Sequence, residues 1–262
     1  MTDTSQPQPE LVSATVDVTA AEGTADAYYA YPAGGARHPA VLLYMDAFGI
    51  RRALEAHVRR LAGMGYCVLA PNVFYRDGRS PVMENIEEQI AAADRTALFA
   101  SLRPRMQRLT PDALNADSAG WLAFLRGRGE VADGPIGAVG YCLGGRLTLR
   151  MAGEFPDDVA AAASFHGGNM ATDQPDSPHL AAVHARAELY IGHADNDGSM
   201  PPEQMARLTR ELAEAHVRHT AELYVGAGHG WTQTDTPVYD RDSAERHWRR
   251  LGDLFGRVLA TS

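Results

Sequence analysis

Cys142 stands in a sequence context that suits a nucleophile. It lies in the segment Gly140-Tyr141-Cys142-Leu143-Gly144-Gly145, between a predicted strand over 136–141 and a predicted helix from about residue 143. This is a G-x-nucleophile-x-G turn with cysteine in the place of serine. Glycines beside the nucleophile allow the strained backbone that lifts its side chain above a sheet. The positive end of the following helix favours a thiolate, and the N–H group of Leu143 is placed to stabilise an oxyanion.

Two later segments supply the acid and the base that such a nucleophile needs. His229 follows a predicted strand over 221–225, and a histidine pKa near working pH lets the ring take and return a proton. Asp195 follows a predicted strand over 187–191, where a carboxylate could orient the histidine. Asp197 is the open alternative for that carboxylate. We therefore predict a triad of Cys142, Asp195 and His229.

The composition excludes several other kinds of chemistry. The formal net charge of −9 disfavours a nucleic-acid partner, because phosphates favour a basic surface. All 24 basic residues are arginine, so a Walker A lysine, a pyridoxal Schiff base and a Ser–Lys dyad are excluded. Two cysteines are too few for a disulfide framework, and the spacing of His216 and His219 gives no persuasive metal site. We expect no metal and no cofactor.

The sequence shows neither an apolar run long enough to span a membrane nor the features of a secretory signal. No apolar run approaches the roughly 18 residues that span a bilayer. The polar stretch Met1–Glu10 lacks the basic and apolar regions of a secretory signal. We expect a soluble cytoplasmic protein without a membrane partner, and a monomer, with a dimer as the alternative.

Short strand-like runs alternate with helical patterns along the chain. This alternation predicts an α/β protein with a mostly parallel central sheet and helices on both faces. We predict one domain over 1–262, with 1–10 as a flexible N-terminal tail. Two leading strands, 11–18 and 25–31, are expected to form a hairpin at the sheet edge. The remaining predicted strands are 40–45, 67–70, 136–141, 160–165, 187–191 and 221–225, and the predicted helices include 50–61, 83–102, 203–215 and a closing helix through 244–258.

Five ordered blocks resemble the dienelactone hydrolase (carboxymethylenebutenolidase) family over about 12–258. The resemblance implies a single domain with the α/β-hydrolase fold, no cofactor and a Cys–His–Asp triad. It also implies an oxyanion hole formed by the N–H groups of Ala47 and Leu143. The blocks are Asp46-Ala47-Phe48-Gly49-Ile50, Ala70-Pro71-Asn72-Val73-Phe74-Tyr75-Arg76, Gly140-Tyr141-Cys142-Leu143-Gly144-Gly145, Gly192-His193-Ala194-Asp195 and Ala227-Gly228-His229-Gly230-Trp231.

The chain departs from the family pattern at three positions that bear on the substrate. Asp46 stands where the family usually has a glutamate that is thought to hold the resting thiol. Of the two arginines with which founding members hold a substrate carboxylate, Arg76 matches the first, whereas the second position falls at Gln233. His166 stands where founding members carry tyrosine. The resemblance thus implies a carboxylate anchor at Arg76 but does not fix the substrate.

We expect a cysteine-dependent hydrolase of small esters or enol lactones that works through a thioester acyl-enzyme. The alternative is a non-catalytic, ligand-binding protein with the α/β-hydrolase fold. A thiol redox role is disfavoured, because no second cysteine lies near Cys142 in the sequence. We expect the segment 83–125 to cover part of the site as a lid. The residues expected to contact the substrate are Asp46, Phe48, Arg76, Tyr141, His166 and Trp231.

Overall fold

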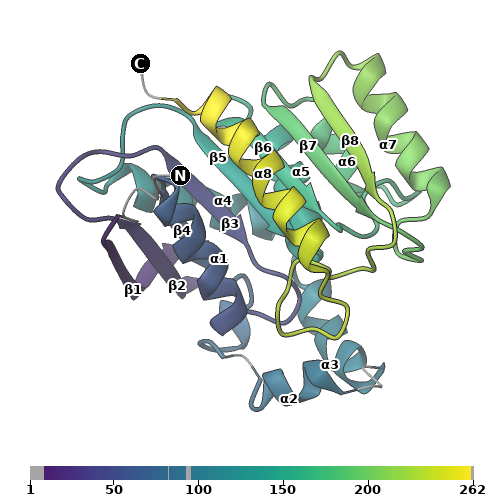
Figure 1. Ribbon diagram of the computed structural model, residues 1–262, viewed down its shortest axis with the longest axis horizontal. Coiled ribbons are helices and arrows are strands. Elements are labelled where there is room, and N and C mark those ends of the chain that lie inside the picture. The colour runs from purple at the N-terminus through teal and green to yellow at the C-terminus, as the bar shows by residue number, and fades with distance from the viewer. Residues whose placement is uncertain (1–8, 82, 93–95, 261–262) are drawn as a thin grey trace, which may run out of the picture.

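A computed structural model describes residues 9–260 except 82 and 93–95. The expected flexible tail therefore lies outside the described residues apart from its last two positions. Within the described part, eight strands form one sheet in the order β1-β2-β4-β3-β5-β6-β7-β8 (Figure 1). The strands are β1 (Leu11–Ala20), β2 (Gly23–Pro32), β3 (Ala40–Tyr44), β4 (Cys67–Pro71), β5 (Ile136–Tyr141), β6 (Val159–Phe165), β7 (Glu188–Ala194) and β8 (His219–Tyr224).

Helices cover both faces of this sheet, which confirms the predicted α/β architecture. Helices α1 and α8 pack on one face, and α4 and α5 pack on the other, where α6 lies against α5 (Figure 1). The helices are α1 (Arg52–Gly63), α2 (Ile86–Ala91), α3 (Thr96–Gln107), α4 (Pro111–Arg126), α5 (Leu143–Glu154), α6 (Pro178–Ala182), α7 (Pro202–Glu214) and α8 (Arg241–Val258). None of the helices in the described part of the chain is long and apolar enough to cross a membrane.

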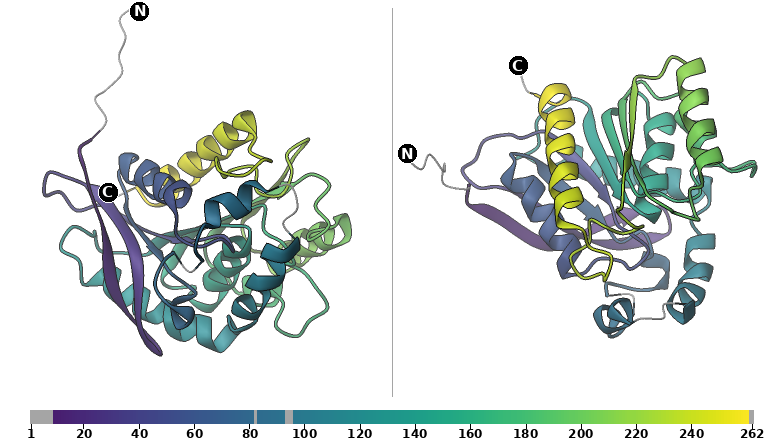
Figure 2. Two further views of the ribbon diagram at one scale, coloured as in Figure 1. Left: turned by 90° about the horizontal axis from the view of Figure 1, so that it is seen from below. Right: turned by 45° about the vertical axis from the view of Figure 1, so that its right-hand side comes forward.

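The pairing of the strands explains the hydrophobic pattern of the sequence. Strands β1 and β2 form the predicted antiparallel hairpin, with Leu11 opposite Pro32, at one edge of the sheet (Figure 2). Strand β2 pairs with β4 antiparallel, and every later pair is parallel. All residues of β3, β4 and β5 are buried, because helices cover both sides of the parallel strands.

The prediction of one helix over 83–102 is wrong, because two short helices, α2 and α3, occupy this region. Each buries a pair of apolar side chains four residues apart, Ile86 and Ile90 in α2 and Leu98 and Leu102 in α3. A pattern with one helical period fits both halves equally well, so it does not reveal where the chain leaves the helix. Ala92 is already in an extended conformation at the end of α2.

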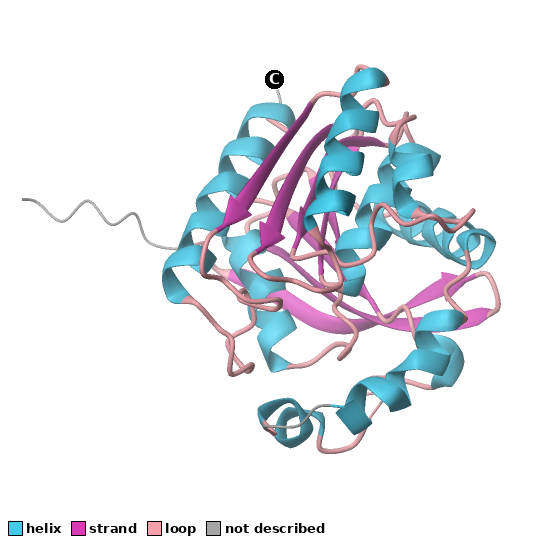
Figure 3. Ribbon diagram, turned by 90° about the vertical axis from the view of Figure 1, so that its right-hand side faces the viewer, coloured by secondary structure: helices cyan, strands magenta, loops and turns pink. Residues whose placement is uncertain are grey.

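The carboxyl ends of the parallel strands face the side of the molecule on which α2 and α3 lie. The arrowheads of the foreground strands in Figure 3 point toward these two helices. In an open parallel sheet, ligands bind beyond the carboxyl ends of the strands. This edge is therefore where the predicted site residues should meet.

Three histidines are buried around Tyr141, below this edge. The rings of His57 and His166 have centroids 4.8 and 6.1 Å from that of Tyr141. The Nδ1–H of His247 donates to the Ala244 carbonyl at 2.5 Å, and its Nε2 accepts from the Tyr141 hydroxyl at 3.2 Å. Burial lowers the pKa of His57 to about 4 and the pKa values of His166 and His247 well below the ordinary histidine value. These rings are therefore neutral in the folded protein near neutral pH.

We expect the buried histidines to make the protein sensitive to acid. Burial also lowers the pKa of His193 to about 4. The unfolded chain binds a proton at each of these four histidines below about pH 6.5, whereas the folded protein does so only near pH 4 or lower. Their contribution to the free energy of unfolding is thus complete above about pH 6.5 and is lost as the pH falls toward 4. Each histidine contributes a slope of about 1.4 kcal/mol per pH unit inside that window.

Urea denaturation between pH 5 and pH 7.5 measures this slope. His57→Phe should reduce the slope by about one proton taken up on unfolding, because the substitution removes one of the four groups. A slope in the variant equal to that of the wild type would show that His57 is not held neutral by burial in the folded protein.

Candidate active site

Cys142 lies at the sharp turn between β5 and α5, as predicted. Its φ of 55° and ψ of −115° are strained for a residue with a side chain. A Cβ atom added at Gly140 would lie 2.0 Å from the Gly144 carbonyl oxygen, and one added at Gly144 would lie 2.2 Å from the Tyr44 carbonyl oxygen. Glycine is therefore required where α5 approaches β3 and β5, and this close approach fixes the position of Cys142.

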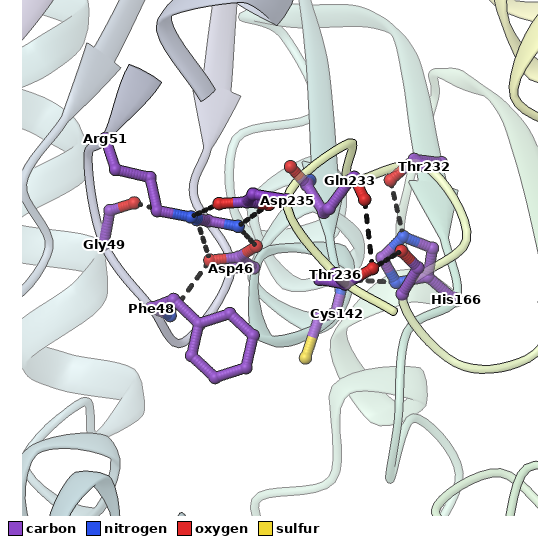
Figure 4. Close-up of polar contacts among 11 residues, drawn as sticks. Asp46, Phe48, Gly49, Arg51, Cys142, His166, Thr232, Gln233, Asp235 and Thr236 are labelled. Atoms are coloured by element: carbon purple, nitrogen blue, oxygen red, sulfur yellow. Dashed lines mark hydrogen bonds and ion pairs between the residues drawn. The ribbon is translucent and has the colours of Figure 1, made fainter. Parts of the chain in front are cut away.

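Cys142 lines a pocket of about 400 Å³. In Figure 4 its sulfur lies on the same open side of the site as the Phe48 ring. Phe99 and Met106 also line the pocket, so α3 forms part of its wall, as expected for part of the segment 83–125. Helix α4 instead packs against β1 and α5. Besides Cys142, the site residues expected from the sequence that line the pocket are Asp46, Ala47, Phe48, Leu143, His166 and His229, and Gln233, the position of the missing second arginine, lines it as well.

His229 is paired with Asp197, so the prediction that Asp195 orients the histidine is wrong. The His229 Nδ1 lies 2.6 Å from the Asp197 Oδ2, and the other carboxylate oxygen accepts from the backbone N–H and hydroxyl of Ser199 at 2.9 and 2.6 Å. Asp195 instead accepts from the Gly226 N–H at 2.8 Å. Between the two acids, Asn196 has a left-handed φ of 53°, which turns the chain and directs the later carboxylate to the histidine.

The surroundings of His229 define the state of its ring. A carboxylate only accepts hydrogen bonds, so Nδ1 carries the proton and Nε2 is left for the nucleophile. Burial lowers the pKa of His229, but the neighbouring Cys142 sulfur and the Asp197 carboxylate outweigh burial and raise this pKa to about 10. Burial raises the pKa of Asp197, but hydrogen bonds from His229 and Ser199 bring it below its ordinary value. The arrangement thus favours a charged imidazolium beside the sulfur.

His166 holds the backbone of Cys142. The Cys142 N–H donates to the His166 Nδ1 at 3.1 Å and also to the Phe165 carbonyl at 3.1 Å. Because Nδ1 accepts, the proton of the neutral ring is on Nε2, which donates to the Thr232 hydroxyl at 2.8 Å. His166 is fully buried, and its ring packs at 5.3 Å from that of His229. It therefore links the nucleophile turn to the loop that carries the histidine base.

Two residues that line the pocket have a backbone N–H group without an acceptor among the described residues. Ala47 follows β3, and Leu143 is the first residue of α5; both line the pocket. Neither N–H group donates to an acceptor among the residues that the structure describes. This is the arrangement that can bind an oxygen atom on which negative charge develops.

Asp46 is tied to Arg51, a residue that the sequence reasoning missed. The guanidinium of the buried Arg51 donates to both Asp46 oxygens at 2.8 and 3.0 Å and to Asp235 at 2.5 Å (Figure 4). The Phe48 N–H also donates to Asp46. The family resemblance implied that the residue at position 46 holds the resting thiol. The hydrogen bonds of Asp46 do not include the Cys142 thiol. Arg51, which binds both Asp46 and Asp235, joins the loop after β3 to the loop after His229.

Arg76 is not available as a substrate anchor, which corrects that expectation. Its guanidinium donates to Asp117 at 2.7 Å and to Glu22 at 2.8 Å, and it does not line the pocket. Tyr141 and Trp231 do not line the pocket either, and both side chains are buried in the core. The Trp231 ring stacks on Tyr224 with centroids 4.6 Å apart.

The arginine that does line the pocket is Arg146, which the sequence reasoning also missed. Its position four residues after Cys142 is the signal that could have identified it, because residues one turn apart on a helix share a face. Within the described part of the chain, no group of three or more His, Cys, Asp or Glu side chains could hold a metal ion.

Comparisons with known proteins identify the family of the chain. The model of the "Dienelactone hydrolase family" matches residues 25–259. The chain is 27% identical over 249 residues to a "Putative carboxymethylenebutenolidase" of Methylorubrum extorquens, covering 94% of this chain and 81% of the relative. It is 26% identical over 224 residues to the carboxymethylenebutenolidase of Rhodococcus opacus, covering 84% and 81%.

Solved structures share the fold. The "Putative Dienelactone Hydrolase" of Klebsiella pneumoniae superposes with a TM-score of 0.81 at 22% identity, covering 95% of this chain and 99% of that one. The acylaminoacyl peptidase of Pyrococcus horikoshii superposes with a TM-score of 0.68 at 17% identity, covering 95% of this chain and 42% of that one. At these identities the likeness shows the α/β-hydrolase fold.

Proposed function

Because the chain belongs to the dienelactone hydrolase family and is a lactone or ester hydrolase, we propose that it cleaves small esters or enol lactones through a thioester on Cys142. The observation that carries this proposal is the position of His229, which lines the same pocket as Cys142 and is paired through Nδ1 with Asp197. A nucleophile, a base and a group that orients the base are the three parts that acyl transfer requires.

Transfer of the Cys142 thiol proton to His229 gives the thiolate–imidazolium pair that the raised pKa of His229 favours, and in the first half of the reaction this thiolate attacks the carbonyl carbon. The carbonyl electron pair moves to the oxygen, which the N–H groups of Ala47 and Leu143 bind. Loss of one such donor costs about 2.7–4 kcal/mol of transition-state stabilisation. When the carbonyl re-forms, the C–O bond breaks and the His229 imidazolium protonates the leaving alkoxide or enolate. A thioester remains on Cys142.

In the second half, His229 takes a proton from a water molecule, and the resulting hydroxide attacks the thioester. The C–S bond breaks, the carboxylic acid leaves, and the thiolate regains a proton from His229. Asp197 keeps Nδ1 protonated throughout, so that the same nitrogen of the ring, Nε2, moves the proton in both halves.

The test is hydrolysis of 4-nitrophenyl acetate and of an enol lactone by the purified protein. We expect steady-state release of 4-nitrophenolate and opening of the lactone well above the rate in buffer. Loss of that activity after brief treatment with iodoacetamide should follow the alkylation of Cys142, because the partly exposed thiol is the attacking group. Full activity after complete alkylation of Cys142 would rule out the thioester route.

His166 should position the nucleophile. His166→Leu removes one of the two acceptors of the Cys142 N–H and leaves the Phe165 carbonyl, and we expect kcat/KM to fall about tenfold, the value of one hydrogen bond of about 1.4 kcal/mol. His166→Asn should retain more activity, because the amide oxygen can occupy a place close to that of Nδ1. Equal losses in the two variants would show that the hydrogen bond to Cys142 is not what His166 contributes.

A further inference from the structure

Arg146 has no partner for its charge in the described part of the chain. It lies in the first turn of α5 and lines the pocket with Cys142, and it forms no hydrogen bond or ion pair with any described residue. The exposed Asp176 and the Cys142 sulfur are the negative groups near it. Burial nevertheless lowers its pKa, so neither neighbour compensates for the water that the guanidinium has lost. A partly buried guanidinium without an anion is a costly arrangement unless a ligand completes it.

The other charged groups of the pocket are already paired. Asp46 is bound through both oxygens by Arg51, and Asp197 is bound by His229. Arg146 is thus the one unpaired cation among the described residues that line the pocket. The local charge therefore favours a substrate that brings one negative group. The planar guanidinium of Arg146 matches the two oxygens of a carboxylate on such a substrate.

Gln233 offers a second, uncharged contact in the same pocket. Its side chain is 1% exposed, and neither the amide oxygen nor the amide nitrogen has a hydrogen-bond partner within the described residues. A buried amide without partners is unfavourable, because it has lost its hydrogen bonds to water. A substrate oxygen within reach would remove that cost. The aromatic pair Phe48 and Phe99, with ring centroids 5.7 Å apart, gives the pocket an apolar side.

We propose that Arg146 makes this hydrolase selective for esters or lactones that carry a carboxylate close to the scissile bond, with the Gln233 amide bonding an uncharged oxygen of the same substrate. This inference rests on the proposed function, because it names the substrate class of that pocket. It places the binding site for the substrate carboxylate at Arg146 of α5, one turn after the nucleophile, rather than at Arg76.

A matched pair of substrates tests the role of Arg146. The 4-nitrophenyl monoester of glutaric acid carries a carboxylate, and its methyl ester has the same chain without the charge. We expect the ratio of kcat/KM values, charged over neutral, to fall about 10- to 100-fold in Arg146→Gln, the loss expected for one charge-assisted hydrogen-bonding pair. Arg249→Gln removes an exposed arginine of α8 and should leave the ratio unchanged.

Gln233→Leu should separate the two contacts. Because the amide is uncharged, this variant should lower kcat/KM for both esters and leave their ratio within about threefold of the wild type. A ratio in Arg146→Gln equal to that of the wild type would overturn the proposal.

Binding without turnover distinguishes this inference from the proposed function. Calorimetry should detect glutarate binding to Cys142→Ala and no binding to Cys142→Ala/Arg146→Gln. If the wild type hydrolyses neither ester but this difference in binding holds, the proposed function fails and the anion site stands. If both esters are hydrolysed and glutarate binds equally to the two proteins, the anion site fails and the proposed function stands.

Discussion

Cys142→Ala should reduce kcat/KM for 4-nitrophenyl acetate by at least about 10⁴-fold, because the substitution removes the atom that attacks the carbonyl. Loss of the nucleophile in hydrolases with such a triad leaves only the contribution of the oxyanion donors and of binding. The side chain is partly exposed in the pocket, so its loss leaves no sealed cavity in the core. Steady-state kinetics with the purified variant measure the effect.

The second cysteine provides the matched control. Cys67 is fully buried in β4 and donates a hydrogen bond to the Glu130 carbonyl at 3.3 Å. Cys67→Ala should lower the stability and leave kcat/KM within about threefold of the wild type. If both alanine variants lost activity alike, or if Cys142→Ala retained it, Cys142 would not be the nucleophile.

Asp197→Asn should reduce kcat by about 10²- to 10⁴-fold, because an amide no longer holds the proton on Nδ1 of His229. The ring can then adopt the tautomer in which Nε2 is protonated and unable to accept the proton of the thiol. Loss of the carboxylate also removes one of the charges that raise the pKa of His229. The pH dependence of kcat, measured alongside its value, should therefore change in this variant.

Asp195→Asn is the control of the same chemistry two residues away. Its amide oxygen can still accept from the Gly226 N–H, so we expect kcat to stay within about threefold of the wild type. The reverse pattern, with Asp195 essential and Asp197 dispensable, would contradict the pairing of His229 with Asp197.

The local features of the site were predictable from the sequence. The turn around Cys142 depends on neighbouring glycines that the chain shows as a motif, and each strand before a site residue has its own apolar pattern. The parallel sheet follows from the same patterns. Asp195 and Asp197, by contrast, differ only through the left-handed backbone of Asn196, which no periodicity predicts.

The contacts between distant segments were not predictable. Arg51 meets Asp235 across 184 positions of the chain, and Arg76 meets Asp117 across 41 positions. The resemblance to the family placed Arg76 in the site, but its guanidinium is bound by Asp117, which lies in α4. Which arginine is left unpaired in the pocket, and is thus free to bind a substrate, depends on all these pairings at once.

The most direct test of the account is the chemical identity of the intermediate. Acid quenching during turnover of 4-nitrophenyl acetate, followed by digestion and mass spectrometry, should find one acetyl group on the peptide that contains Cys142, in a linkage that hydroxylamine removes. An acetyl group on any other residue, or steady turnover with Cys142 always unmodified, would contradict a reaction that passes through a thioester.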